Sequence, residues 1–409
     1  MFDNLIGKVK WAFILKVLSS AIGFISTFLI GYILTPTDAG KYFYFLGLVM
    51  SIGGLARIGL DNLTLKSIPE YLSQAECHNS DKHISVSCLI CIVNSIFILI
   101  ITKVFFDIDS DIYDFLCFAL IPFAVINVFG VFFQARGDVK KGLLISSVLP
   151  QAINVILLLV LTQFNKDLIS VMSAYCISFV FVLGGLFKYI KKYFVRVQFA
   201  DFLSVIKKAK SFMMISLLGI LNVNYPIILI SNFLPIENSA YYSVSMKLAT
   251  INVFVLSAVN SVVAPKFSFY KKQNEHNKIK SLAKKSTRMM LACALPVCFF
   301  ILLFPEDILN FFGDEYINET SVLCLRILAI AQFINVSTGA TSYLLQMVGH
   351  SHTYAFVLAI VTFSSMFISV LAAKSLGFIA VVCVIAASIV LLNVFSVLLV
   401  RLKLNFWMI

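Results

Sequence analysis

The chain has 409 residues, of which 60% are hydrophobic and only 13% are charged, with a formal net charge of +12 and a mean hydropathy of +0.97. This composition excludes a soluble globular domain, in which about a quarter of the residues are charged. The apolar runs are continuous, which excludes a β-barrel, because barrel strands alternate in character over roughly ten residues.

Twelve segments in chain order have the length of a membrane-spanning helix, which needs about 20 mostly apolar residues. They are 11–34, 42–60, 84–106, 112–134, 143–164, 168–189, 212–234, 241–265, 289–308, 321–348, 354–373 and 378–400. The sequence therefore predicts an all-α, polytopic membrane protein with about 12 transmembrane helices. The first segment is too long for a cleavable signal peptide and is followed by eleven more, so we predict no signal peptide.

The basic residues predict the orientation. If the N-terminus and every second loop are cytoplasmic, 25 of the 32 Lys and Arg residues lie inside and only Lys41, Lys103, Lys166 and Lys374 lie outside. This bias predicts cytoplasmic N- and C-termini. The positive net charge is then explained by the basic cytoplasmic loops, which can rest on anionic membrane lipids. We therefore predict no nucleic-acid partner.

The loops predict a transporter rather than an enzyme. The predicted external loops are short, and the chain has no P-loop, no dinucleotide-binding glycine motif, no HExxH and no nucleophile elbow. The lone CxxC at Cys88 and Cys91 lies within an apolar segment and is interpreted as packing. We therefore predict no catalytic residue, no cofactor and no metal site.

One predicted external turn occurs twice in the sequence. PTDAGKYF begins at Pro36, after the first predicted span, and PIENSAYY begins at Pro235, after the seventh. A proline stops the preceding helix, and a carboxylate, Asp38 or Glu237, favours the N-terminus of the next one. The aromatic residues that follow are expected at interfacial depth: Tyr42, Phe43, Tyr241 and Tyr242. We interpret the turn as structural.

A second pattern also recurs at matching positions. Gln134 to Gly137 leaves the fourth predicted span, and Gln346 to Gly349 leaves the tenth, both as Q-x-x-G. Two matches predict a 6+6 arrangement of parallel repeats, as in alternating-access carriers. The predicted parts are an N-lobe of helices 1–6 at residues 1–190, a cytoplasmic basic linker at 191–211 and a C-lobe of helices 7–12 at 212–409.

Four cations fall within or at the edge of predicted spans: Lys16, Arg57, Lys247 and Arg326. A cation at mid-bilayer costs on the order of 2.5–3.5 kcal/mol, and such residues usually face a cavity. Asp61 is the only carboxylate close in sequence, and it lies at the edge of a span. Snorkelling to the membrane surface remains the alternative for each.

Helical spacing favours a cavity for two of them. Lys16 shares a face with Ser20, Gly23 and Thr27, and Lys247 shares one with Ser243, Thr250, Ser257 and Ser261. Amides add hydrogen-bonding capacity in other spans, where Gln332 and Asn335 share one face of the tenth span with Gly339, and the fifth span has Gln151 with Asn154. Asn222 and Asn224 precede Pro226, which could break the seventh span. The predicted substrate-binding residues are Lys16, Arg57, Lys247, Arg326, Gln332, Asn335, Asn222 and Asn154. Cations with amides suit an anionic, hydroxyl-rich substrate.

Nearly the whole chain resembles the Wzx-type O-antigen flippases of the multidrug/oligosaccharidyl-lipid/polysaccharide (MOP) exporter superfamily. The resemblance rests on the 6+6 layout, on PTDAGKYFYF, on QARGDVKKG after the fourth span, on NSAYYSVSMKLATINVFVLSAVNSVVAPKFSFYKK across the eighth, and on PEDILNFFGDEY after the ninth.

The resemblance implies a two-lobed bundle in the bacterial inner membrane. It would flip undecaprenyl-pyrophosphate-linked oligosaccharide from the cytoplasmic to the periplasmic leaflet, with an O-antigen polymerase and a chain-length regulator as protein partners. Cations on spans one, two and eight face the cavity in related flippases, and Lys16, Arg57 and Lys247 lie on those spans. We hypothesise that Lys16 and Arg57 draw in the pyrophosphate, and that Lys247 and Arg326 hold it in the outward-open state.

Two other functions stay open. A cation-coupled multidrug-type antiporter of the same superfamily typically has an acidic residue in the N-lobe, whereas here no carboxylate lies deep in a predicted span. A membrane polymerase or ligase would need a large external loop, and none is predicted.

Overall fold

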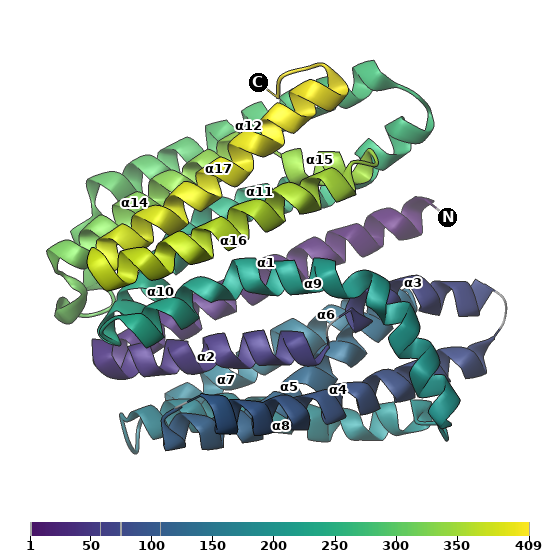
Figure 1. The fold of residues 1–409 in the computed structure, drawn as a ribbon, viewed down its shortest axis with the longest axis horizontal. Coiled ribbons are helices and arrows are strands. Elements are labelled where there is room, and N and C mark those ends of the chain that lie inside the picture. Colours follow the sequence, from purple (N-terminus) through teal and green to yellow (C-terminus); the bar gives the residue numbers. More distant parts are fainter. Residues whose placement is uncertain (1, 58, 74–75, 107, 409) are drawn as a thin grey trace. The chain divides into compact units, whose positions relative to one another are not determined.

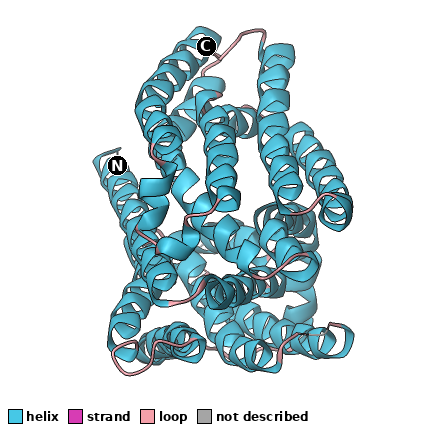
Figure 2. Cartoon of the chain, turned by 90° about the vertical axis from the view of Figure 1, so that its left-hand side faces the viewer, coloured by secondary structure: helices cyan, strands magenta, loops and turns pink. Residues whose placement is uncertain are grey.

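The computed structural model describes residues 2–57, 59–73, 76–106 and 108–408, and every regular element in that part of the chain is helical (Figure 2). Among these residues, eleven helices are long and apolar enough to cross a membrane, and the eighth of the twelve predicted spans, 241–265, is not one of them. The expected all-α, polytopic architecture is therefore confirmed.

The chain forms two compact units. Unit 1 comprises Met1–Leu34 and Lys41–Ile228, and unit 2 comprises Thr35–Gly40 and Leu229–Ile409. Residues 199–211 of the predicted linker are helical and open the long helix α9 (Phe199–Phe233). Most of α9 thus belongs to the compact unit 1. The sequence repeat instead predicts that the seventh span, which lies in α9, begins the C-lobe.

Unit 1 is organised around α5, which contacts α3, α4, α6 and α8. Its core side chains include Leu116, Leu120, Phe129 and Phe132, all fully buried. Besides part of α9, the unit contains α1 (Phe2–Ile33), most of α2 (Pro36–Ala56), α3 (Leu60–Ser73), α4 (Cys77–Phe105), α5 (Ser110–Ala135), α6 (Val139–Leu143), the π-helical η1 (Leu144–Val148), α7 (Leu149–Leu161), α8 (Leu168–Ile190) and η2 (Lys191–Tyr193).

Unit 2 is organised around α14, which contacts α10, α11, α12 and α17, and Figure 1 shows α16 and α17 side by side. After the end of α9, the unit contains α10 (Glu237–Ala249), α11 (Ile251–Lys272), α12 (His276–Leu303), α13 (Pro305–Asn310), η3 (Asp314–Tyr316), α14 (Glu319–Ser337), α15 (Thr341–Met347), α16 (Ser351–Ser375) and α17 (Phe378–Leu404).

Two predicted spans of unit 2 are interrupted helices. The eighth is divided at Thr250, between α10 and α11, and the tenth is divided at Thr338, between α14 and α15. Each threonine hydroxyl donates to the carbonyl three residues earlier, over 2.8 Å to Lys247 and 2.9 Å to Asn335. The same bond occurs within the unbroken helix α12, from Ser286 to Ala283, so it does not by itself interrupt a helix. After Thr338 the backbone leaves helical geometry at Gly339, whose φ is 76°.

The Q-x-x-G repeat has the same structure in both places. Gly137 and Gly349 have positive φ angles of 91° and 99°, which glycine adopts without steric cost. The next residue donates to a carbonyl five residues back in each case, from Asp138 to Phe133 and from His350 to Leu345. The two copies of Q-x-x-G, one in each unit, thus form the same Schellman-type helix end.

The first residues of the two turns, 36–40 and 235–239, both belong to unit 2. The Thr37 hydroxyl donates to the Glu237 carboxylate over 3.1 Å, so the two copies touch each other. A methyl group at Gly40 would overlap the carbonyl oxygen of Ile236, so the backbones meet where Gly40 has no side chain.

Three aromatic residues of this turn are buried in protein. Tyr42 is 1% exposed and Phe43 is 7% exposed, both in unit 1, and Tyr242 in unit 2 is 5% exposed, whereas Tyr241 is half-buried. Tyr42 packs edge-on against Phe43, with ring centroids 5.8 Å apart. The buried rings therefore contribute to helix packing.

Candidate functional site

The predicted site residues fall into separate groups, and we describe each within its own unit. In unit 1, a polar seam joins α1 to α7. The Ser19 hydroxyl donates to the Gln151 amide oxygen over 3.0 Å, and the Asn154 amide donates to the Ser26 hydroxyl over 3.3 Å. Asn154 is 5% exposed, so its amide contributes to helix packing. Lys16 lies one turn before Ser19 and its side chain is exposed.

Arg57 lies at the junction of α2 and α3 and is held on three sides. It forms an ion pair with Asp61 over 2.6 Å, its Nε donates to the Gly53 carbonyl over 3.0 Å, and its guanidinium lies 5.7 Å from the centre of the Phe123 ring. The Arg57 side chain is 13% exposed and that of Asp61 35% exposed. The pairing at i and i+4 explains how a cation is accommodated here, and it leaves donors of Arg57 available to an anion.

Breaking this pair from one side is expected to destabilise unit 1 more than removing both charges. Arg57→Met leaves Asp61 without its partner, and we expect a cost of about 1–2 kcal/mol, between the values for exposed and buried pairs. Arg57→Met combined with Asp61→Asn should recover most of that loss. Thermal unfolding of the four proteins in one detergent gives the coupling as a double-mutant cycle, and additive shifts would contradict it.

Asn222 is half-buried in α9. The expected break at Pro226 is wrong, because α9 continues through this proline to Phe233. Pro226 is buried, and the helix lacks one backbone hydrogen bond there because proline has no N–H.

In unit 2, Gln332 and Asn335 form one network on α14. The Asn335 amide donates to the Gln332 amide oxygen over 2.9 Å, and the Gln332 amide donates to the Met246 sulfur of α10 over 3.6 Å. Gln332 is 5% exposed. The sequence prediction that these two amides share a face is confirmed.

Lys247 follows Met246 on α10 and is half-buried. No Asp or Glu among the residues that the structure describes lies within 4.0 Å of its ammonium group. Ser243 and Thr250, predicted on its face, are also half-buried. The side chains of Ser257 and Ser261, predicted on the same face, lie outside the described ones. Lys247 is thus a cation in the predicted eighth span, and within the part of the chain that the structure describes it has no carboxylate partner.

The network reaches one residue that sequence reasoning missed. The Thr338 hydroxyl, at the break between α14 and α15, also donates to the Asn393 amide oxygen of α17 over 3.0 Å. Asn393 is one of the few amides in the twelfth span, and this rarity is the signal that could have identified it.

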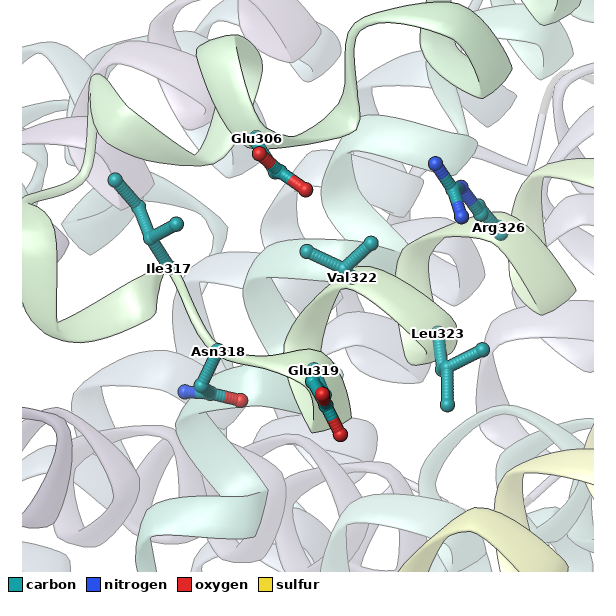
Figure 3. Close-up of a pocket in the computed structure, with 7 residues that line it drawn as sticks. All are labelled: Glu306, Ile317, Asn318, Glu319, Val322, Leu323 and Arg326. Carbon is teal, nitrogen blue, oxygen red and sulfur yellow. The ribbon is translucent and has the colours of Figure 1, made fainter.

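Arg326 does not join Gln332 and Asn335. At 3.6 residues per turn, nine residues rotate a side chain by about 180°, so Arg326 and Asn335 lie on opposite faces of α14. Arg326 instead lines an open pocket of about 450 Å³ at the start of α14, which we call the α14 pocket (Figure 3). Its lining residues are Glu306, Ile317, Asn318, Glu319, Val322, Leu323 and Arg326.

Carboxylates in the described spans are confined to the first five residues of a helix. Asp81 is typical: it lies five residues into α4 and forms an ion pair with Arg136 over 3.0 Å. The others are Asp38, Asp111, Asp114, Glu237 and Glu319. The span interiors therefore offer cations, amides and hydroxyls to a substrate.

The comparisons with known proteins agree with a transporter. Residues 81–321 match the model of a family described as polysaccharide biosynthesis protein. No curated protein matches the chain significantly.

Solved structures share the fold over nearly the full length. An inward-facing multidrug resistance MATE family transporter of the MOP superfamily is 15% identical, with 95% of this chain and 94% of that chain covered and a TM-score of 0.72. The outward-facing form of a transporter of the same description has 15% identity, 98% and 95% coverage and a TM-score of 0.60. A MOP superfamily transporter from Pyrococcus furiosus has 15% identity, 98% and 95% coverage and a TM-score of 0.62. These similarities establish the two-lobed, helical transporter fold predicted from the sequence.

Proposed function

Because the chain belongs to the polysaccharide biosynthesis protein family and has the fold of MOP-superfamily transporters, we propose that it is a lipid-linked oligosaccharide flippase. It moves undecaprenyl-pyrophosphate-linked repeat units of O-antigen, or of a related surface polysaccharide, from the cytoplasmic to the periplasmic leaflet of the bacterial inner membrane by alternating access.

The observation that carries this proposal is the distribution of charge in the spans. Lys16, Arg57 and Lys247 lie in or beside predicted spans, whereas the carboxylates of the described spans lie within the first five residues of a helix. Lys and Arg bind phosphate through charge-assisted hydrogen bonds, which a pyrophosphate would use. Amides such as Gln332 and Asn335 offer donors and acceptors to sugar hydroxyls.

In this proposal the cations act in sequence. Lys16 and Arg57, near the ends of their spans that are predicted to be cytoplasmic, receive the pyrophosphate in the inward-open state. Lys247 lies eleven residues into α10, counted from Glu237, and holds it in the outward-open state. The polyprenyl chain stays in the lipid. Arg326 is given a different role below, because it faces away from Asn335.

A cation-coupled multidrug antiporter is the second candidate, favoured by the similarity to MATE transporters. Its cationic substrates would meet like charges at Lys16 and Lys247. The similar transporter from Pyrococcus furiosus is described as having a binding pocket of reverse polarity that suggests a different function. Pocket polarity thus differs among proteins of this fold, and the present chain fits an anionic substrate.

The experiment that tests the proposal is deletion of the gene in its native host. We expect surface polysaccharide to be lost and lipid-linked repeat units to accumulate on the cytoplasmic side, with both effects reversed by the plasmid-borne gene. Drug susceptibility of the two strains should be equal. Normal surface polysaccharide in the deletion strain, together with ion-dependent drug sensitivity, would instead establish the antiporter.

A further inference from the structure

The α14 pocket contains opposite charges that do not neutralise each other. Glu306 comes from the first turn of α13 and Arg326 from the second turn of α14, and both side chains are exposed. In the part of the chain that the structure describes, no ion pair within 4.0 Å involves either of them. The pocket lining therefore carries one cation, Arg326, and two carboxylates, Glu306 and Glu319.

The side chains are directed into the same space. Figure 3 shows the Glu306 carboxylate pointing toward Val322 and Arg326, while the Glu319 carboxylate points away from them. Helical side chains lean toward the N-terminus of their helix, so Arg326 reaches back toward the opening of the pocket at the start of α14. Asn318 and Glu319 have structural roles, because Asn318 caps α14 by accepting from the Ser321 amide over 2.8 Å, and Glu319 meets the helix dipole.

The remaining wall is apolar and accessible. Ile317 is 38% exposed and Leu323 is 45% exposed, and both line the pocket beside the charged groups. A volume of about 450 Å³ is within the usual range for small-molecule sites, roughly 300–1,000 Å³. A ligand with separated charges and an attached apolar part would use the whole surface.

The depth of the pocket in the membrane indicates where such a ligand is found. The first turns of a spanning helix lie at the boundary between hydrocarbon and headgroups, because the hydrocarbon is about 30 Å thick and headgroups extend the bilayer to about 40–45 Å. This holds for either orientation of the protein.

We propose that the α14 pocket binds the headgroup of a zwitterionic phospholipid, with the phosphate on Arg326 and the primary ammonium on Glu306. Ile317 and Leu323 contact the glycerol and upper acyl region. A primary ammonium donates hydrogen bonds to a carboxylate, whereas a quaternary one cannot, so phosphatidylethanolamine is the preferred lipid. The site is separate from the proposed transport function and does not depend on it.

Native mass spectrometry of the detergent-purified full chain tests this directly, with short-chain phosphatidylethanolamine, phosphatidylcholine and phosphatidylglycerol as probes. We expect phosphatidylethanolamine to bind about tenfold more tightly than the other two (about 1.4 kcal/mol). Glu306→Gln should abolish the preference over phosphatidylcholine, and Arg326→Gln should weaken both zwitterionic lipids. Asp307→Asn is the matched control, because Asp307 is exposed on the same turn of α13, carries the same charge and does not line the pocket.

Four outcomes would overturn the proposal. They are equal binding of all three lipids, tighter binding of phosphatidylglycerol, an equal loss in Asp307→Asn, and binding of water-soluble phosphoethanolamine as tight as that of the lipid. The last outcome would reveal a site for the free zwitterion without a lipid contribution.

Discussion

Replacing Lys247 by methionine is expected to lower transport by roughly ten- to hundredfold while raising the thermal stability of the protein. Lys247 is half-buried in α10 and has no carboxylate within 4.0 Å among the described residues. An unpaired cation within a span costs on the order of 2.5–3.5 kcal/mol at full depth, and methionine of similar length removes that cost. A charge-assisted hydrogen bond to phosphate contributes about 1.5–3 kcal/mol, which corresponds to the predicted loss.

The opposite signs of the two effects distinguish a substrate residue from one that only snorkels. Surface polysaccharide in the complemented deletion strain gives the first readout, and unfolding of purified protein gives the second. Lys247→Arg should keep substantial transport, because it keeps the charge. Lys374→Met is the control, since Lys374 is an exposed cation in the last turn of α16. If Lys247→Met transports as well as wild type, Lys247 does not bind the substrate.

Among glycine-to-alanine substitutions in α2, Gly40→Ala is expected to destabilise the folded protein most. The added Cβ would overlap the backbone carbonyl of Ile236, which no side-chain rotation can relieve. Overpacking typically costs about 1–3 kcal/mol, and a clash with backbone lies at or above the upper end. We expect little folded protein in the membrane at the growth temperature.

Two other glycines provide matched comparisons. At Gly54, also in α2, a Cβ would lie 2.9 Å from a terminal region of the Ile220 side chain, which can adjust, so Gly54→Ala should be milder. At Gly219 in α9 a Cβ would meet nothing within 4 Å, and alanine should stabilise the helix by up to about 1 kcal/mol. Fluorescence size-exclusion of tagged variants ranks all three, and equal profiles would contradict the described contact at Gly40.

The helical content, the spans and the repeat could be predicted because they depend on local patterns. The Q-x-x-G repeat is the clearest case, since a glycine after a helix end determines the same backbone at Gly137 and Gly349. The break after Thr338 has a signal in the sequence that our reasoning missed, since Gly339 follows and has a positive φ of 76°. The break at Thr250 could not be predicted, because Thr102 makes the same hydrogen bond within the unbroken helix α4.

The candidate site was harder to derive than the fold. Spacing predicted that Gln332 and Asn335 act together and that Asp61 lies near Arg57, and both contacts are present. The nine-residue spacing between Arg326 and Asn335 already places them on opposite faces of a helix. The hydropathy of the span gives no reason to attach importance to that separation. The contribution of Glu306 depends on how the short helix α13 approaches α14, which no local pattern specifies. The burial of Tyr42 could not be predicted, because an aromatic residue at a span end suits a helix interface as well as a headgroup.

The contact between the two turns also sets an order for assembly during synthesis. Thr37 and its partner Glu237 are 200 residues apart in the chain. At roughly 5–20 residues per second, the ribosome reaches the partner about 10–40 s after it has made the first turn. During that time Thr37 lacks its hydrogen-bond partner Glu237, and the backbone of Ile236 does not yet pack on Gly40. The turn between α1 and α2 is therefore made first, but it gains this contact only when α10 is made. Unit 2 thus includes a segment that is synthesised before all of its other helices.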